Sequence, residues 1–135
     1  KKYFRLFKNS KNVKFVLEAM FSSTNEIMGT SYSSRIEDPK YQFAGKTGTS
    51  QVKRITKKDR ELDLDLDQIP YEDRDHALYV AFGPYKKPRY AVSIIVEHGG
   101  SGSSTAAPIA KKLFKLIIDR HEIRELARKN NSIKT

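Results

Sequence analysis

The sequence contains no cysteine in its 135 residues. Without cysteine it can form neither a disulfide framework nor a thiolate metal site, and this absence fits any cellular compartment. It also has no run of eighteen apolar residues, and its amino terminus lacks the apolar core of a signal peptide. The chain as given is therefore expected to be soluble, and any membrane anchor of its parent protein to lie in another segment.

Acidic residues are too few to balance the basic ones, and the formal net charge is +10. Such a surplus favours a polyanionic partner. The basic residues are spread over the amino end, a polar loop and the last helix, and no nucleic-acid module pattern accompanies them. We therefore predict a solvated basic surface on a single domain, with no nucleic-acid partner. A basic polyanion-binding module is an alternative that charge alone supports.

One short run, residues 43–52 (FAGKTGTSQV), combines a lysine, two threonines and glycines within a strand-like pattern. Thr47 and Thr49 are two apart, so their hydroxyls should leave one face of a strand. Gly48 removes a side chain that would keep an extended peptide away. Lys46 adds positive charge, although strict alternation places it on the opposite face. The run is suited to hold a carboxylate and an amide chain, unless it is an edge strand with incidental lysine and threonine.

The hydrophobic pattern predicts an α+β fold in which a three-stranded antiparallel meander is packed by two helices. The predicted strands are residues 41–52, 76–83 and 89–98, and the predicted helices lie near 11–25 and 105–128. Ser10 and Thr105 are expected to cap the helices. The expected buried helix faces are Val13, Val16, Leu17 and Met20, then Ile109, Leu113, Leu116 and Ile117.

In the last strand, Val92, Ile94 and Val96 share one face and Ile95 lies on the other, which predicts a central strand covered on both sides. Residues 99–104 are expected to form a flexible linker, and residues 130–135 to fray.

Residues 53–75 form a long polar loop. Within it Asp63, Asp65 and Asp67 have the spacing of a calcium loop, but Gln68 and Arg74 replace the required glycine and glutamate. We therefore expect no metal here, and instead a short amphipathic strand or a partner-facing loop.

The run AGKTGTSQV resembles the KTG box of the penicillin-recognising serine acyltransferases. Three further stretches resemble class B penicillin-binding proteins of the elongation type: VLEAMFSSTNEIMGTSY before the box, DHALYVAFGPYKKPRYAVSIIVEHGGSG after it, and AAPIAKKLF. The resemblance covers most of residues 10–118 in collinear order. It implies a partial penicillin-binding transpeptidase domain, with a β-lactamase-like fold.

By this resemblance the parent protein is a D,D-transpeptidase that crosslinks peptidoglycan stem peptides through a serine acyl-enzyme. Lys46 would orient a second-motif hydroxyl and supply positive potential. Thr47, Gly48, Thr49 and Ser50 would bind the substrate, and the Thr49 backbone N–H would be an oxyanion donor. No cofactor and no metal are implied.

The nucleophile motif SxxK and the second motif SxN have no credible copy. Ser50 and Lys53 match SxxK formally but lie an odd number of residues apart on a strand, so they point to opposite faces. Ser10 and Asn12 match SxN formally but open a helix close to the box. We therefore expect residues 1–135 to be the carboxy-terminal part of a transpeptidase domain, catalytically inert alone. Its peripheral segments are expected to be 1–9 and 119–135.

The implied partners are the peptidoglycan stem peptide, β-lactam antibiotics and, in the parent, a membrane glycan polymerase. The implied location is the periplasmic face of the bacterial inner membrane. Self-association through the exposed strand 90–97 is expected as well, since its edge would be unpaired. A β-lactamase or β-lactam-sensor fragment is an alternative, against which the EHGGSG corner and the AAPIAKKLF helix argue.

Overall fold

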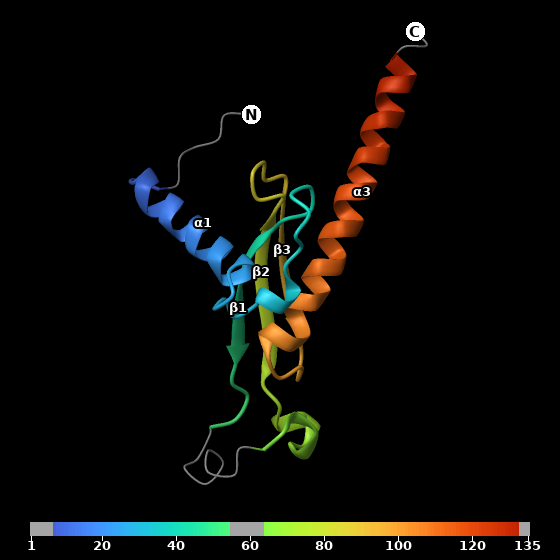
Figure 1. The fold of residues 1–135 in the computed structure, drawn as a ribbon. Helices are drawn as coiled ribbons and strands as arrows, with labels where there is room; N and C mark the ends of the chain where they lie inside the picture. The colour runs from blue at the N-terminus through green and yellow to red at the C-terminus, as the bar shows by residue number, and fades with distance from the viewer. Residues whose placement is uncertain (1–6, 55–63, 133–135) are drawn as a thin grey trace.

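The computed structural model describes residues 7–54 and 64–132. Its strands form one antiparallel sheet in the order β1-β2-β3 (Figure 1). They are β1, Ala44–Ser50, β2, His76–Gly83, and β3, Tyr90–Val96, and the long helices are α1, Ser10–Asn25, and α3, Ala107–Ser132. The predicted α+β fold and meander are confirmed, with β1 shorter at both ends than expected.

Short helical turns connect these elements. They are 3-10 turns at Tyr32–Ser34, Leu66–Gln68 and Tyr71–Asp73, and a π-helical turn at Gly102–Ala106. The expected strand does not form in the described residues 64–75, and Asp63 lies outside the described residues. Over the described ranges, no helix combines the length and apolar character needed to cross a membrane.

One face of the sheet carries the core. In β2 every second side chain is buried, including Ala77, Tyr79 and Ala81, whereas Val80 on the other face is 47% exposed. In β3 half-buried side chains alternate with exposed ones, and Ile95 is 63% exposed. The prediction that β3 is central and covered on both sides is therefore wrong, because β2 is the middle strand and the described helices cover only one face.

Helix α3 packs on the sheet through a face other than the predicted one. Its buried side chains are Ala107, Ala110, Phe114 and Ile118, spaced three or four residues apart. Of the four residues expected to be buried, Ile109 and Leu116 are 43% and 55% exposed, while Leu113 and Ile117 are half-buried. The alanines let the helix approach the sheet closely, and Phe114 stacks on Phe43 with ring centroids 4.9 Å apart. The buried face of α3 is therefore the one whose small side chains allow the helix to approach the sheet closely, and not the one with the largest apolar side chains.

Helix α1 touches the sheet only near its carboxyl end, and both helices lead away from the sheet (Figure 1). The one fully buried side chain of α1 is Thr24, while Val16 of the predicted apolar face is 54% exposed. The predicted cap is displaced by one residue, since Asn9 accepts a hydrogen bond from the Lys11 backbone N–H at 2.9 Å.

The segment expected to be a flexible linker is an ordered corner. Gly100 has a φ of 75° and donates its N–H to the Asp75 carbonyl at 2.8 Å. Ser101, not Thr105, caps the helical turn that follows, and the Thr105 hydroxyl donates to the Gly99 carbonyl at 2.8 Å. Helix α3 also continues to Ser132, beyond the expected start of fraying at residue 130.

Tyr79 ties α1 to the sheet. Its hydroxyl lies 2.9 Å from Thr24 Oγ1 and 3.0 Å from Ser31 Oγ, and all three side chains are fully buried. Burial raises the pKa of Tyr79 above its ordinary value, and the bonds to Ser31 and Thr24 oppose that shift. The ring runs across Gly45, where an added Cβ would lie 2.5 Å from Tyr79 Cζ.

The loop before β1 is fastened to α3 by a second polar contact. The Tyr41 hydroxyl donates to Asp119 Oδ1 at 2.6 Å, and Lys40 Nζ lies 3.2 Å from the same oxygen. The Tyr41 hydrogen bond lowers the pKa of Asp119 below its ordinary value, and Lys40 adds to this effect.

Replacing Gly45 by alanine should destabilise the chain by about 1–3 kcal/mol, because the new methyl group meets the Tyr79 ring. Gly48→Ala is the matched control in the same strand. There the nearest atom to an added Cβ is Leu78 Cβ at 3.3 Å, so the loss should be clearly smaller. Urea unfolding of both variants measures the difference, and equal losses would contradict the tight contact at Gly45.

Replacing Tyr41 by phenylalanine should raise the pKa of Asp119 toward its ordinary value. The lowered pKa stabilises the folded chain above the unfolded-state pKa of about 3.9, and this stabilisation is lost as pH falls through the folded-state value. The stability gap between the two proteins should thus be present at neutral pH and narrow below about pH 4. NMR titration of the Asp119 carboxyl tests the shift, with Tyr32→Phe as control, and an unchanged Asp119 pKa would contradict it.

Candidate functional site

The outer edge of β1 is partly sealed and partly open. The Gly45 N–H donates to Thr24 Oγ1 at 3.0 Å, and Asn25 Nδ2 donates to the Phe43 carbonyl at 2.9 Å. These backbone groups therefore point away from β2. Since backbone groups two residues apart in an antiparallel strand point the same way, those of Thr47 and Thr49 also face outward. No described strand pairs with this edge, so it is open from Thr47 onward except at the Thr47 carbonyl, which accepts from Lys46 Nζ.

The side chains of the KTG segment gather at this open edge. Thr47 and Thr49 pair with Tyr79 and Ala77 and share their face, as the alternation predicts, and Lys46 lies on the other face opposite Val80. The Lys46 side chain nevertheless bends back. Its Nζ donates to the Thr47 carbonyl at 2.8 Å and lies 3.4 Å from Thr47 Oγ1. The flexibility of the lysine side chain thus brings its ammonium close to the Thr47 hydroxyl.

Exposure along the segment leaves the predicted site residues accessible. Lys46, Thr49 and Ser50 are exposed, while Thr47 and Gly48 are half-buried. The backbone of Gly48 is approached closely by Gly102, since a Cβ on Gly102 would lie 2.6 Å from the Gly48 carbonyl oxygen. The close packing of the π-helical turn thus depends on the missing side chain of Gly102, whereas a Cβ on Gly48 itself would meet only Leu78 Cβ at 3.3 Å.

Two hydroxyls near Thr47 were not predicted from the sequence. Thr30 Oγ1 lies 3.1 Å from Thr47 Oγ1, and Ser23 Oγ lies 3.2 Å from Thr30 Oγ1. Ser23 is on α1, and Thr30 follows Gly29 in what reads as a polar loop. No local spacing links either residue to Thr47, because the contact exists only after α1 packs against β1.

The formal SxxK pair is not assembled as a nucleophile and base. Ser50 is the last residue of β1 and is exposed. Lys53 Nζ pairs with Asp73 Oδ2 at 2.8 Å, so its ammonium is committed to a carboxylate on the neighbouring turn. The ion pair between Lys53 and Asp73 is consistent with the expectation that Ser50 and Lys53 match the SxxK motif only by chance.

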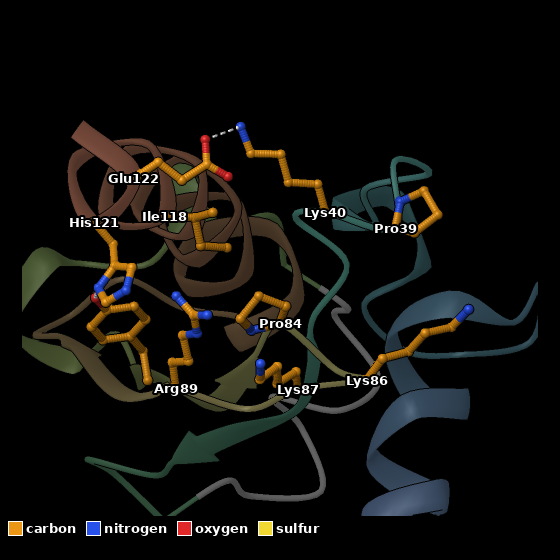
Figure 2. A pocket seen from close by; sticks show the side chains of 10 residues that line it. Pro39, Lys40, Pro84, Lys86, Lys87, Arg89, Ile118, His121 and Glu122 are labelled. Carbon is orange, nitrogen blue, oxygen red and sulfur yellow. Dashed lines mark hydrogen bonds and ion pairs between the residues drawn. The ribbon is translucent and has the colours of Figure 1, made fainter. Parts of the chain in front are cut away.

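A separate hollow of about 240 Å³ lies at the β2–β3 hairpin. Figure 2 shows its lining: Pro39, Lys40, Pro84, Lys86, Lys87, Arg89, Tyr90, Ile118, His121 and Glu122. Lys40 and Glu122 pair across its rim at 2.8 Å, and this hydrogen bond raises the pKa of Lys40 above its ordinary value. None of the KTG residues lines this hollow, so it is distinct from the candidate site.

Comparison with known proteins identifies the family. The model of the penicillin binding protein transpeptidase domain matches residues 7–115. Peptidoglycan D,D-transpeptidase MrdA of Salmonella typhimurium strain LT2 is 40% identical over 104 residues, which are 77% of this chain and 16% of that protein. MrdA of Acinetobacter baumannii is 40% identical over 99 residues, which are 73% of this chain and 13% of that protein.

Solved structures agree with these relatives. PBP2 of Pseudomonas aeruginosa, solved in complex with WCK 5153, has a TM-score of 0.63 and 30% identity over 84% of this chain and 21% of that chain. PBP2 of Helicobacter pylori, solved in complex with MreC, has a TM-score of 0.59 and 31% identity over 86% of this chain and 19% of that chain.

These matches confirm the predicted resemblance and favour a transpeptidase over the β-lactamase alternative. The chain spans only 16% of the length of its Salmonella typhimurium relative. It is part of a transpeptidase domain and belongs to the penicillin-binding protein transpeptidase domain family.

Proposed function

We propose that this chain provides the KTG wall of the active site in a peptidoglycan D,D-transpeptidase, which crosslinks stem peptides through a serine acyl-enzyme and binds penicillin. The observation that carries the proposal is the open edge of β1, where the Lys46 ammonium lies 3.4 Å from the Thr47 hydroxyl. The relatives named D,D-transpeptidase support the reaction class.

The open edge is suited to an extended peptide. The Thr47 N–H and the outward backbone groups of Thr49 can pair with a peptide as an added strand, whereas the Thr47 carbonyl already accepts from Lys46 Nζ. Thr47 and Thr49 offer hydroxyls to its terminal carboxylate, and Lys46 supplies the positive charge that favours the anion. Gly48 and Ser50 complete the surface on which the peptide or the β-lactam lies.

In this mechanism Thr49 also contributes its backbone N–H. That group faces outward at the edge and can donate to the oxyanion that forms when a serine attacks the peptide carbonyl. A fixed backbone donor stabilises the developing charge without reorganising during the reaction. Lys46 assists by orienting the second-motif hydroxyl and by its positive potential.

The attacking serine and its lysine base belong, in this proposal, to a part of the protein outside this chain. Covalent catalysis needs a nucleophile whose base lies within hydrogen-bond reach. Ser50 lacks such a base in Lys53, which pairs with Asp73 at 2.8 Å. The chain alone should therefore be inert, and the site should be complete only in the parent protein.

The parent is proposed to act at the periplasmic face of the bacterial inner membrane, beside a membrane glycan polymerase. The resemblance is the ground for both statements. The Helicobacter pylori relative was solved with MreC, a different partner, so it adds no support for the polymerase. Stem peptides and β-lactams are the proposed ligands of the KTG wall, with no cofactor or metal.

In the full-length parent protein, Lys46→Ala should lower the second-order rate of acylation by fluorescent penicillin about ten- to hundredfold, as expected for losing a charge-assisted contact. Lys112→Ala, which removes an equal charge from an exposed position of α3, is the control. Stopped-flow labelling measures both rates. Equal rates in the Lys46 variant and the wild type would contradict the proposed role.

The 135-residue chain alone should form no covalent penicillin adduct, because the proposed nucleophile and its lysine base lie outside it. Intact-mass measurement after incubation with penicillin tests this expectation. A stoichiometric adduct on any residue of this chain would refute the placement of the nucleophile elsewhere.

We also propose that the isolated chain self-associates through β3. Within the described sheet the outer edge of this strand has no partner, and Ile95 is 63% exposed. An unpaired apolar edge favours pairing with another copy. Light scattering at high concentration should detect dimers or larger species, and Ile95→Lys should reduce them. Leu116→Lys adds the same charge on α3 and serves as the control. If only Leu116→Lys dissociates the self-associated species, the contact between copies lies on α3 and not on β3.

A further inference from the structure

We propose that Thr30 is a positioning residue that makes the Thr47 hydroxyl a dedicated hydrogen-bond donor and thereby selects ligands that carry a carboxylate. Ser23 anchors Thr30 in this role. The inference rests on the proposed function of β1, and the experiments below separate the two.

The hydrogen-bonding capacity of one hydroxyl carries the argument. A threonine hydroxyl has one donor and two acceptor positions, whereas an ammonium only donates. Lys46 Nζ lies 3.4 Å from Thr47 Oγ1, so Thr47 is the acceptor in that contact. Thr30 Oγ1 lies 3.1 Å from Thr47 Oγ1 and can fill the second acceptor position. The proton of Thr47 is then free to point toward a ligand at the open edge.

A carboxylate completes this arrangement because it only accepts hydrogen bonds. When Thr47 donates to it, Thr30 must donate to Thr47, and Ser23, 3.2 Å from Thr30 Oγ1, can donate in turn to Thr30. All three hydroxyl dipoles then point toward the anion. Such chains strengthen each bond cooperatively. A ligand that offers a donor at this position would find no acceptor on Thr47.

Thr30 is held in place from behind. The neighbouring Ser31 donates both its backbone N–H and its hydroxyl to the Ser23 carbonyl at 3.0 Å, and its buried side chain reaches Tyr79. The turn is tight at Gly29, where an added Cβ would lie 2.5 Å from the Ser22 carbonyl oxygen. The same packing that fixes α1 on the sheet therefore sets the Thr30–Thr47 distance.

A purely structural tie between Thr30 and Thr47 would have different consequences. Its loss would lower stability and weaken all ligands alike. A positioning role instead predicts a change in the rotamer of Thr47 and in discrimination between carboxylate and ester. These readouts distinguish the two roles.

The first experiment uses the 135-residue chain. Thr30→Val keeps the shape of the side chain and removes the hydroxyl. In this variant the three-bond NMR couplings of the Thr47 methyl carbon should change from values typical of a single side-chain rotamer to values averaged over several rotamers. Thr30→Ser should restore the wild-type couplings. Ser22→Ala is the matched control, because the Ser22 hydroxyl bonds to Glu26 at 2.9 Å rather than to this chain of hydroxyls. Unchanged couplings in Thr30→Val would overturn the proposal.

The second experiment uses the full-length parent protein with benzylpenicillin and its methyl ester as probes. Thr30→Val should slow acylation by the acid about tenfold while changing the rate with the ester little, and Thr30→Ser should restore the rate. Combined with Thr47→Val, the effect of Thr30→Val on the acid should vanish, since residues acting through one bond are not additive. Thermal unfolding of each variant confirms that it is folded.

The outcomes separate the inference from the function on which it rests. If Thr47→Val leaves the acylation rate unchanged, the proposed role of the strand fails. If Thr47→Val slows acylation but Thr30→Val does not, or if Thr30→Val slows acid and ester equally, only the positioning role fails. The positioning role is supported if Thr30→Val slows acylation by the acid but not by the ester, and if the effects of Thr30→Val and Thr47→Val on the acid are not additive.

Discussion

The contact between the Thr24 hydroxyl and the sheet is the constraint on which the rest of the structure depends. This one fully buried group bonds to the Gly45 backbone at 3.0 Å and to the Tyr79 hydroxyl at 2.9 Å, so it joins α1, β1 and β2. A buried hydroxyl without partners would be costly, and this network satisfies each of its members. No buried polar side chain in the described residues lacks a partner.

The same contact decides where the edge of β1 is available. The end of α1 supplies Asn25 to the carbonyl of Phe43, just before β1, and Thr24 to the N–H of Gly45, and no described strand pairs with the edge beyond them. A strand edge is a template for another extended chain. The helix therefore limits pairing to the segment that also carries the lysine and threonines. Fold stability and ligand access are set by one packing arrangement.

The helices illustrate where pattern reading from sequence failed. Leu116 and Ile109 have the spacing of a buried face, yet α3 turns Ala107, Ala110 and Phe114 to the core. Periodicity identifies a helix but does not tell which of two apolar stripes meets the sheet, because shape complementarity decides that. The same limit applies to β3, whose apolar run on both faces was taken for central placement although the described sheet ends there.

Local chemistry along the chain was sufficient for the element types, their approximate bounds, the antiparallel order and the grouping of Thr47 with Thr49 on one face. These follow from periods of 3.6 and 2 residues, which need no distant partner. Packing alone brought Ser23 and Thr30 to Thr47 and joined Gly45 to Thr24 of α1. Such contacts join residues far apart in the sequence, so no short-range pattern encodes them, and they exist only once the helix rests on the sheet.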